Sequence, residues 1–321
     1  MKKINWVGAA FLGLAVLWTA CSQGGGSGQP SGGETRTGKL KVVTTTTMIT
    51  DLVKQVGGDL VEVEGLMEPG VDPHQYDPTA GAVTKMRAAD LIFYNGLMLE
   101  GKMDDRLVEM ARDKTKLVYA ITEKIDRKKL LEPEEFEGHY DPHVWFDPTL
   151  WVLCVDLVVE GLGAADAANK AKYEANGEAL KEEILEIHEW AKSRVAQVPE
   201  GSRVLVTSHD AFNYFAGAYD FEVVALLGIS TEDEASAANV TRLVDLIKSK
   251  NIKAIFSETS VSSKGIDQIR KDAGVENGGE LFSDAMGKPG EMEGPEGAQY
   301  DVGTYQGMIK HNINTVVEAL K

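Results

Sequence analysis

The chain has 321 residues, a formal net charge of −17 and two cysteines, and 43% of its residues are hydrophobic. This length and composition suit two globular domains with apolar cores. The acidic balance argues against a nucleic-acid partner, and two cysteines cannot build a disulfide framework.

The N-terminus resembles an export signal that ends in a lipid-attachment site. Its charged start and the apolar stretch 7–18 are typical of a signal peptide, because the stretch is too short to span a membrane. The run Leu-Trp-Thr-Ala-Cys ending at Cys21 resembles a bacterial lipobox, although Trp18 stands where Leu is usual. We therefore expect a signal peptide over 1–20, a lipidated Cys21 and a Gly/Ser-rich tether over 21–38. Ordinary cleavage before the cysteine, giving a free secreted protein, is the alternative.

The next part of the chain alternates apolar, β-branched runs with helical patterns. The expected strands are 39–46, 60–67, 91–94 and 116–120, and the expected helices are 49–56, 79–89 and 103–112. Such alternation predicts a parallel sheet covered by helices. We assign 39–163 to an N-terminal lobe, in which Cys154 is expected to be a small buried core residue.

The sequence Asp-Pro-His occurs twice in this lobe, over 72–79 and 141–149, and each copy leads through an aromatic residue to Asp-Pro-Thr. Proline stiffens the approach to His74 and to His143. The second Asp-Pro of each copy predicts a helix start, with Asp as the N-cap and Pro as the first helical residue. Neutral imidazole is the commonest protein metal ligand, so two histidines in matching settings predict one metal ion between them.

Residues 164–198 are rich in Ala, Glu and Lys, and they contain neither Gly nor Pro between 178 and 198. Leu180, Ile184 and Ile187 fall on one face at helical spacing. This pattern predicts a helix of about 30 residues, longer than most helices inside one domain. We expect it to link two lobes; a long surface helix is the alternative.

The α/β pattern then resumes in a C-terminal lobe over 199–321. The expected strands are 204–207, 221–226, 254–257 and 280–282, and the expected helices are 239–250, 265–273 and 304–320. The fold class is therefore α/β, with a parallel sheet in each lobe.

Polar residues follow several of these strands. His209 and Asp284 come directly after strands, and His74 follows one through a short loop. Ligands of open α/β sheets bind beyond the carboxyl ends of the strands, so we expect His74, His143, His209 and Asp284 to form a metal site between the lobes. Three imidazoles and one carboxylate suit tetrahedral Zn²⁺. Glu258, also at a strand end, either orients a ligand imidazole through a hydrogen bond or caps its loop.

These residues give the chain a resemblance to the metal-binding subunits of bacterial ABC importers for Zn²⁺ and Mn²⁺, the cluster A-I (cluster 9) solute-binding proteins. The matching segments occur in the family's order and are 72–78, 141–151, 207–215, 230–240, 254–262, 281–287 and 303–308. The resemblance implies two Rossmann-like lobes joined by a single long helix, with the metal between them. It assigns ligand roles to the same four residues.

The sequence lies between the zinc and manganese patterns of that family. Zinc members often carry a long His/Asp-rich loop, whereas the only histidine in 121–142 is His139. Manganese members often have Glu where His209 stands. Imidazole suits Zn²⁺, whereas Mn²⁺ prefers oxygen ligands. We therefore expect Zn²⁺ first, Mn²⁺ as the alternative and Fe²⁺ behind both.

The expected protein is an exported, membrane-anchored monomer, at the cell surface or in the periplasm, that passes metal to the permease of an ABC transporter. It is not expected to be an enzyme. A zinc-dependent hydrolase is a rival reading, but catalytic zinc keeps a coordination position open for water. The chain also has neither a His-Glu-x-x-His nor a Gly-x-Ser-x-Gly motif. The other rival is a surface adhesin that uses the metal structurally.

Overall fold

The structure is a computed structural model, and it describes residues 38–321 except 114, 137, 233 and 234. The expected signal peptide, Cys21 and all but the last residue of the tether lie outside the described residues.

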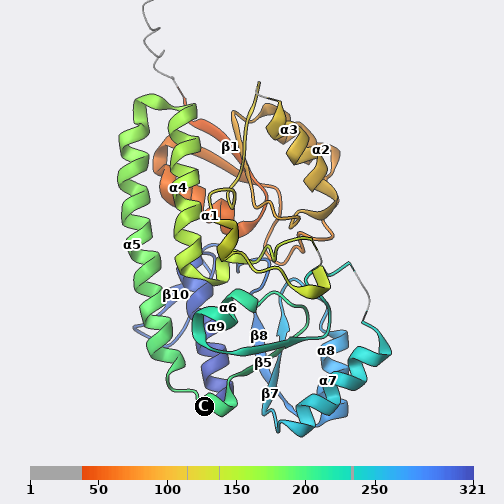
Figure 1. The fold of residues 1–321 in the computed structure, drawn as a ribbon. Coiled ribbons are helices and arrows are strands. Elements are labelled where there is room, and N and C mark those ends of the chain that lie inside the picture. Colours follow the sequence, from red (N-terminus) through yellow and green to blue (C-terminus); the bar gives the residue numbers. More distant parts are fainter. Residues whose placement is uncertain (1–37, 114, 137, 233–234) are drawn as a thin grey trace, which may run out of the picture. The chain divides into compact units, whose positions relative to one another are not determined.

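The N-terminal half is built on a four-stranded parallel sheet. Its strands lie in the order β2-β1-β3-β4, and β1 is labelled in Figure 1. Their bounds are β1 Leu40–Thr44, β2 Val61–Gly65, β3 Leu91–Tyr94 and β4 Leu117–Ala120. The helices of this half are α1 Thr47–Gly57, α2 Ala80–Ala88 and α3 Asp104–Arg112. Every residue of β3 is buried, as expected for a central parallel strand covered on both faces.

The C-terminal half also uses parallel strands, in two pairs that contact each other through β5 and β7. The pairs are β5 Val204–Thr207 with β6 Glu222–Ala225, and β7 Ala254–Glu258 with β8 Glu276–Leu281. The helices are α6 Asn213–Tyr219, α7 Ala237–Ser249, α8 Lys264–Ala273 and α9 Tyr305–Leu320. An antiparallel hairpin, β9 Met292–Glu293 with β10 Tyr300–Asp301, was not expected from the sequence.

Short 3-10 turns connect many of these elements. They are η1 Gly58–Leu60, η2 Gly101–Met103, η3 Arg127–Lys129, η4 Glu134–Phe136, η5 Val144–Phe146, η6 Ala167–Asn169 and η7 Glu200–Ser202.

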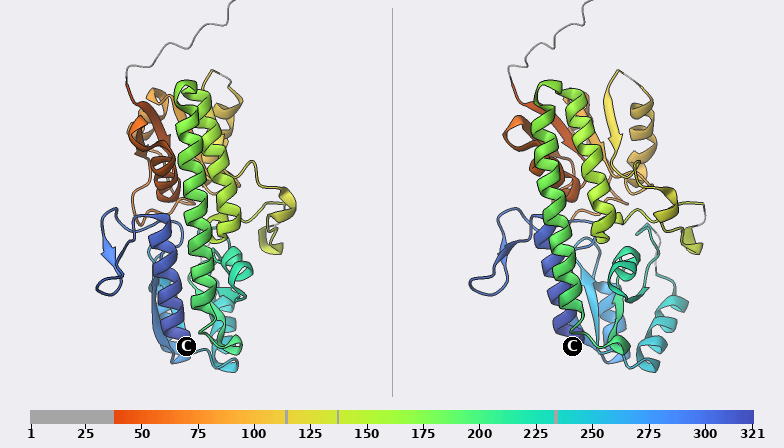
Figure 2. Two further views of the ribbon diagram at one scale, coloured as in Figure 1. Left: turned by 90° about the vertical axis from the view of Figure 1, so that its left-hand side faces the viewer. Right: turned by 60° about the vertical axis from the view of Figure 1, so that its left-hand side comes forward.

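Two long helices, α4 Pro148–Ala165 and α5 Lys170–Val195, form a hairpin, and α5 runs beside both halves (Figure 2). The α/β class with one long backbone helix is confirmed. The helix begins later than expected because the chain turns at Asp166, whose carboxylate accepts hydrogen bonds from Asn169 and Tyr173. Helix α4, whose start was expected at Pro148 but whose length was not, is long and apolar enough to cross a membrane, and just over half of it is buried in this core.

The two Asp-Pro-Thr sequences start their helices differently. Asp147 caps α4 by accepting from Thr149 N at 2.8 Å, and Pro148 is the first helical residue, as predicted. The same prediction is wrong for Asp77, because α2 begins at Ala80, two residues after Pro78. There the Thr79 hydroxyl accepts from Ala82 N at 3.1 Å and satisfies the free amide in its place.

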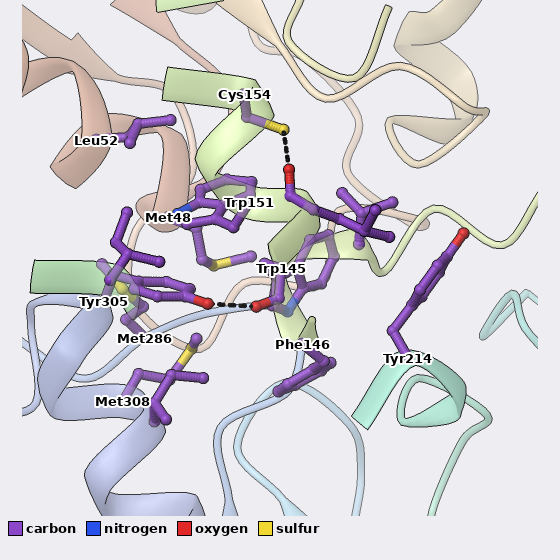
Figure 3. Close-up of a cluster of buried hydrophobic side chains, with 14 of the residues drawn as sticks. Met48, Leu52, Trp145, Phe146, Trp151, Cys154, Tyr214, Met286, Tyr305 and Met308 are labelled. Carbon is purple, nitrogen blue, oxygen red and sulfur yellow. Dashed lines mark hydrogen bonds between the residues drawn. The ribbon is translucent and has the colours of Figure 1, made fainter. Parts of the chain in front are cut away.

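One apolar cluster runs through both halves of the chain (Figure 3). Met48 of α1 and Trp151 of α4 belong to the N-terminal half, and Tyr305 and Met308 of α9 reach them from the C-terminal half. The Tyr305 ring stacks on Trp151 with 5.6 Å between centroids, and its hydroxyl donates to Trp145 O at 2.8 Å. The halves are therefore joined by packed side chains as well as by α5.

Candidate metal site

The four expected ligand side chains meet between the two halves. His74, His143, His209 and Asp284 are all buried, and each offers one atom that lies within 4.8 Å of the others. Asp284 Oδ2 lies 3.1 Å from His209 Nε2 and 3.9 Å from His74 Nε2, and Asp284 Oδ1 lies 3.3 Å from His143 Nε2. The two N-terminal imidazoles approach to 3.4 Å between their Nε2 atoms. Three ring nitrogens and one carboxylate thus face a common centre.

The local turn that presents each N-terminal histidine depends on the aspartate of its motif. Asp72 Oδ1 accepts from His74 N, and Asp141 Oδ1 accepts from His143 N, both at 2.9 Å. From the sequence, proline alone was expected to make these loops rigid. The spacing of two residues between Asp and His is the signal that could have revealed the turn.

Carboxylates on the far side of two rings fix which nitrogen faces the centre. Asp141 Oδ1 lies 2.7 Å from His143 Nδ1, and Glu258 Oε2 lies 2.5 Å from His209 Nδ1. Because an ionised carboxylate only accepts, the proton is on Nδ1 and Nε2 can present a lone pair to a cation. Glu258 Oε1 also accepts from Ser208 N and His209 N, so Glu258 contacts both the ring of His209 and the backbone of its loop.

Burial and neighbouring charges shift the pKa values of the site residues in different directions. Burial alone would lower the pKa of His143, but the Asp141 and Asp284 carboxylates outweigh it and raise that pKa to about 9. Burial is likewise outweighed at His209, where Glu258 and Asp284 raise the pKa well above its usual value. Burial dominates at His74 and lowers its pKa to about 3. The imidazoles in turn hold the pKa of Asp284 well below its usual value, against the effect of burial.

Several polar atoms at the centre are buried without a hydrogen bond of acceptable geometry. They are His209 Nε2 and both carboxylate oxygens of Asp284. Buried polar groups are nearly always paired, and a cation would satisfy these together with the neighbouring ring nitrogens. The residues therefore fit a divalent transition-metal ion.

A buried glutamate outside the ligand set braces both N-terminal ligand loops. Glu100 accepts from the Thr45 hydroxyl at 2.8 Å and from Asn95 N at 2.6 Å. The Asn95 amide in turn donates to Pro142 O, one residue before His143. On the other side, Gly101 lies so close to the His74 loop that an added Cβ would stand 2.2 Å from His74 O. Burial raises the pKa of Glu100 to about 7, despite these donors.

The loop that carries Asp284 is held by side chains from two other elements. Asn312 of α9 pairs with Phe282 in both directions, accepting from its N–H at 2.9 Å and donating to its carbonyl at 2.7 Å. Trp145 Nε1 donates to Ser283 O at 3.0 Å. The role of Asn312 was not predicted, because a lone Asn in an amphipathic helix has no distinctive sequence pattern.

The family of this chain follows from comparison with known proteins. Residues 42–319 match the model of the family described as "Zinc-uptake complex component A periplasmic" (ZnuA). The chain belongs to this family. The match spans nearly all described residues of both halves, so the expected family is confirmed.

Curated relatives of this ZnuA-family chain carry both zinc and manganese names. It is 41% identical to the manganese-binding lipoprotein MntA of Bacillus subtilis, over 92% of this chain and 94% of that protein. It is 42% identical to the zinc-binding protein TroA of Treponema pallidum, over 88% and 89%. The metal ABC transporter substrate-binding lipoprotein FimA of Streptococcus parasanguinis is 32% identical over 100% and 99%. The solved structure of TroA superimposes with a TM-score of 0.82 and covers 88% of this chain and 99% of that one.

The raised pKa values of His143 and His209 make metal binding compete with protons. Binding must displace the Nε2 protons, so affinity should fall as pH drops from about 9 towards 6, by about tenfold per pH unit for each proton released. The fall therefore begins well above the unperturbed histidine pKa of 6.5. Calorimetry in buffers of different ionisation heat would count the protons, and affinity that stays flat over this range would contradict the site.

The same shifts set the opposite trend for the metal-free protein. A histidine whose folded pKa is raised contributes stability that is fully present below its unfolded pKa and is lost as pH rises through the folded pKa. The metal-free protein should therefore lose stability between pH 6.5 and about 9, while the metal-bound protein should not. Thermal unfolding of both forms across this range would show the divergence.

Proposed function

We propose that this protein captures a divalent transition-metal ion between its two halves and delivers it to the membrane permease of an ABC importer. The supporting observation is the convergence of four buried ligand atoms within 4.8 Å. In this proposal His74 and His143 of the N-terminal half, and His209 and Asp284 of the C-terminal half, are the ligands. The names of the relatives, which include metal ABC transporter substrate-binding lipoproteins, support the same role.

Capture follows from the placement of the ligands. A cation that bonds to both halves stabilises the arrangement in which all four bonds are made, because it makes fewer bonds when the halves part. The permease would then receive the metal by binding this arrangement and favouring its opening. The protein acts as a monomer in this scheme, because one chain supplies every ligand.

Hydrolysis and structural use of the metal fit the site less well. Four protein ligands complete a tetrahedral shell, whereas catalytic zinc keeps a position for water. A structural metal for a surface adhesin would not need ligands shared between two halves. The geometry therefore favours reversible capture.

We further propose that the protein is exported and anchored to the membrane through lipidated Cys21, with the segment to residue 38 as a tether. The lipoprotein names of MntA and FimA support this. The anchored protein should sediment with membranes, and Cys21→Ser should abolish incorporation of labelled palmitate. Equal labelling of both proteins would remove Cys21 as the anchor site.

For the metal itself we propose Zn²⁺ first, Mn²⁺ second and Fe²⁺ behind both. Three imidazoles around one carboxylate favour Zn²⁺, and the general affinity order of divalent metals places Zn²⁺ above Mn²⁺. One relative is named for manganese and another for zinc, so the names do not choose between the two metals.

The function is tested by removing the carboxylate that faces all three imidazoles. Asp284→Ala deletes the only anionic ligand and one of two contacts from the C-terminal half, so the ion's double charge is left uncompensated in a buried pocket. Metal affinity should fall more than about 100-fold, beyond the usual loss for removing a ligand's hydrogen-bond partner. Isothermal titration would measure the affinity, and metal uptake by cells lacking the native protein would measure delivery.

Asp245→Ala, on the exposed face of α7, is the matched control and should bind and deliver metal as the wild type does. If Asp284→Ala restores uptake as well as the wild type, the proposed delivery role is wrong. X-ray scattering with and without metal would measure closure of the two halves. In Asp284→Ala this metal-dependent closure should weaken more than the stability of the metal-free fold.

Metal choice is tested by exchanging the imidazole that manganese members often replace. His209→Glu substitutes an oxygen ligand for nitrogen and adds negative charge, so relative preference for Mn²⁺ over Zn²⁺ should rise at least about tenfold. Competition titrations of the two ions against each protein measure the ratio. An unchanged ratio would place His209 outside the ligand set.

A further inference from the structure

The aspartate of the first Asp-Pro-His motif bonds to both halves of the protein. Its Oδ1 accepts from His74 N, and its Oδ2 accepts from the hydroxyl of Thr231 at 2.5 Å. Thr231 lies between β6 and α7 in the C-terminal half and is 5% exposed. Gln75, beside the histidine, also donates to Thr231 O at 3.0 Å. The loop of His74 is thus bonded to the opposite half through the half-buried Asp72 and the exposed Gln75, which both contact the buried Thr231.

The second motif repeats this division with different partners. Asp141 Oδ1 accepts from His143 N and lies 2.7 Å from His143 Nδ1, and Oδ2 accepts from the Asn213 amide at 3.1 Å. Asn213 begins α6 in the C-terminal half, and the next residue, Tyr214, donates its hydroxyl to Asp141 O at 3.0 Å. In each motif, one aspartate oxygen accepts from the histidine loop and the other accepts from a residue of the C-terminal half. These bonds hold both histidine loops from across the interface.

The C-terminal histidine is supported differently. The carboxylate behind His209 is Glu258 at the end of β7, which belongs to the same half. Its ring orientation therefore needs no contact with the N-terminal half. Among the three imidazoles that the structure describes at the site, only the two from the Asp-Pro-His motifs are supported by a carboxylate that also bonds to the opposite half.

We propose that Thr231 and Asn213 are positioning residues that make the placement of His74 and His143 depend on contact between the halves. Their bonds to Asp72 and Asp141 exist only while the halves are together. When the halves part, each aspartate loses its partner in the C-terminal half and keeps only the bonds within its own half. This inference rests on the proposed function. It adds that opening loosens His74 and His143, besides moving them away from His209 and Asp284.

The expected signature is faster metal release with altered ligand geometry. Thr231→Val and Asn213→Leu keep side-chain size while removing the hydroxyl and the amide. Loss of a group that orients a metal ligand typically costs 10–100-fold in affinity. Each variant should therefore release Zn²⁺ to excess chelator about tenfold faster in stopped-flow measurements. The visible absorption of the Co²⁺-loaded protein should also change, since it reports ligand geometry.

Matched substitutions on the exposed part of α7 separate this role from general damage. Thr241→Val and Asn239→Leu should keep the wild-type release rate and Co²⁺ spectrum, and Thr231→Ser should restore both because it retains the hydroxyl. Wild-type release and spectrum in both Thr231→Val and Asn213→Leu, even with lower thermal stability, would overturn the inference. If Asn213→Leu does not fold, Thr231→Val alone decides it. Wild-type protein that binds neither Zn²⁺ nor Co²⁺ would instead overturn the proposed function.

Discussion

A single carboxylate placed against three buried imidazoles sets the main electrostatic constraint on this structure. The Asp284 side chain is 1% exposed, and two of the rings it faces have raised pKa values. A buried charge is costly unless it is paired and hydrogen-bonded. The rings of His143 and His209 are aligned by the carboxylates of Asp141 and Glu258. The loops are held by hydrogen bonds to Glu100 and Asn312. The site is therefore prearranged for a small cation.

The two halves are held together by interactions of two kinds. The apolar cluster that includes Trp151 and Tyr305 joins them near α5 and α9. Polar contacts join them beside the ligands, through Asp72 with Thr231 and Asp141 with Asn213. Polar contacts exchange readily with water on opening, whereas separating packed side chains exposes apolar surface.

Much of this architecture was predictable because local signals and global fold agree. Alternating strand and helix patterns gave the parallel sheets, and strand ends marked His209 and Asp284. The four ligand side chains come together as expected. Interactions between residues far apart in sequence were not visible. Nothing near Asn312 or Asn213 indicates which backbone or carboxylate it meets, and Thr79 displaced Asp77 as a helix cap through a choice between two adequate residues. The sequence shows what each segment prefers, but not which distant partner satisfies it.

The apolar cluster shared by the halves has a thermodynamic consequence. Binding reactions that remove much apolar surface from water show a large negative heat-capacity change. Here Met48 and Trp151 of one half pack with Met308 of the other, in a cluster that also includes Trp145 beside His143. Apolar surface that stays packed when the halves part contributes nothing to the heat capacity of metal capture. The temperature dependence of the binding heat therefore measures how much of this cluster closure buries.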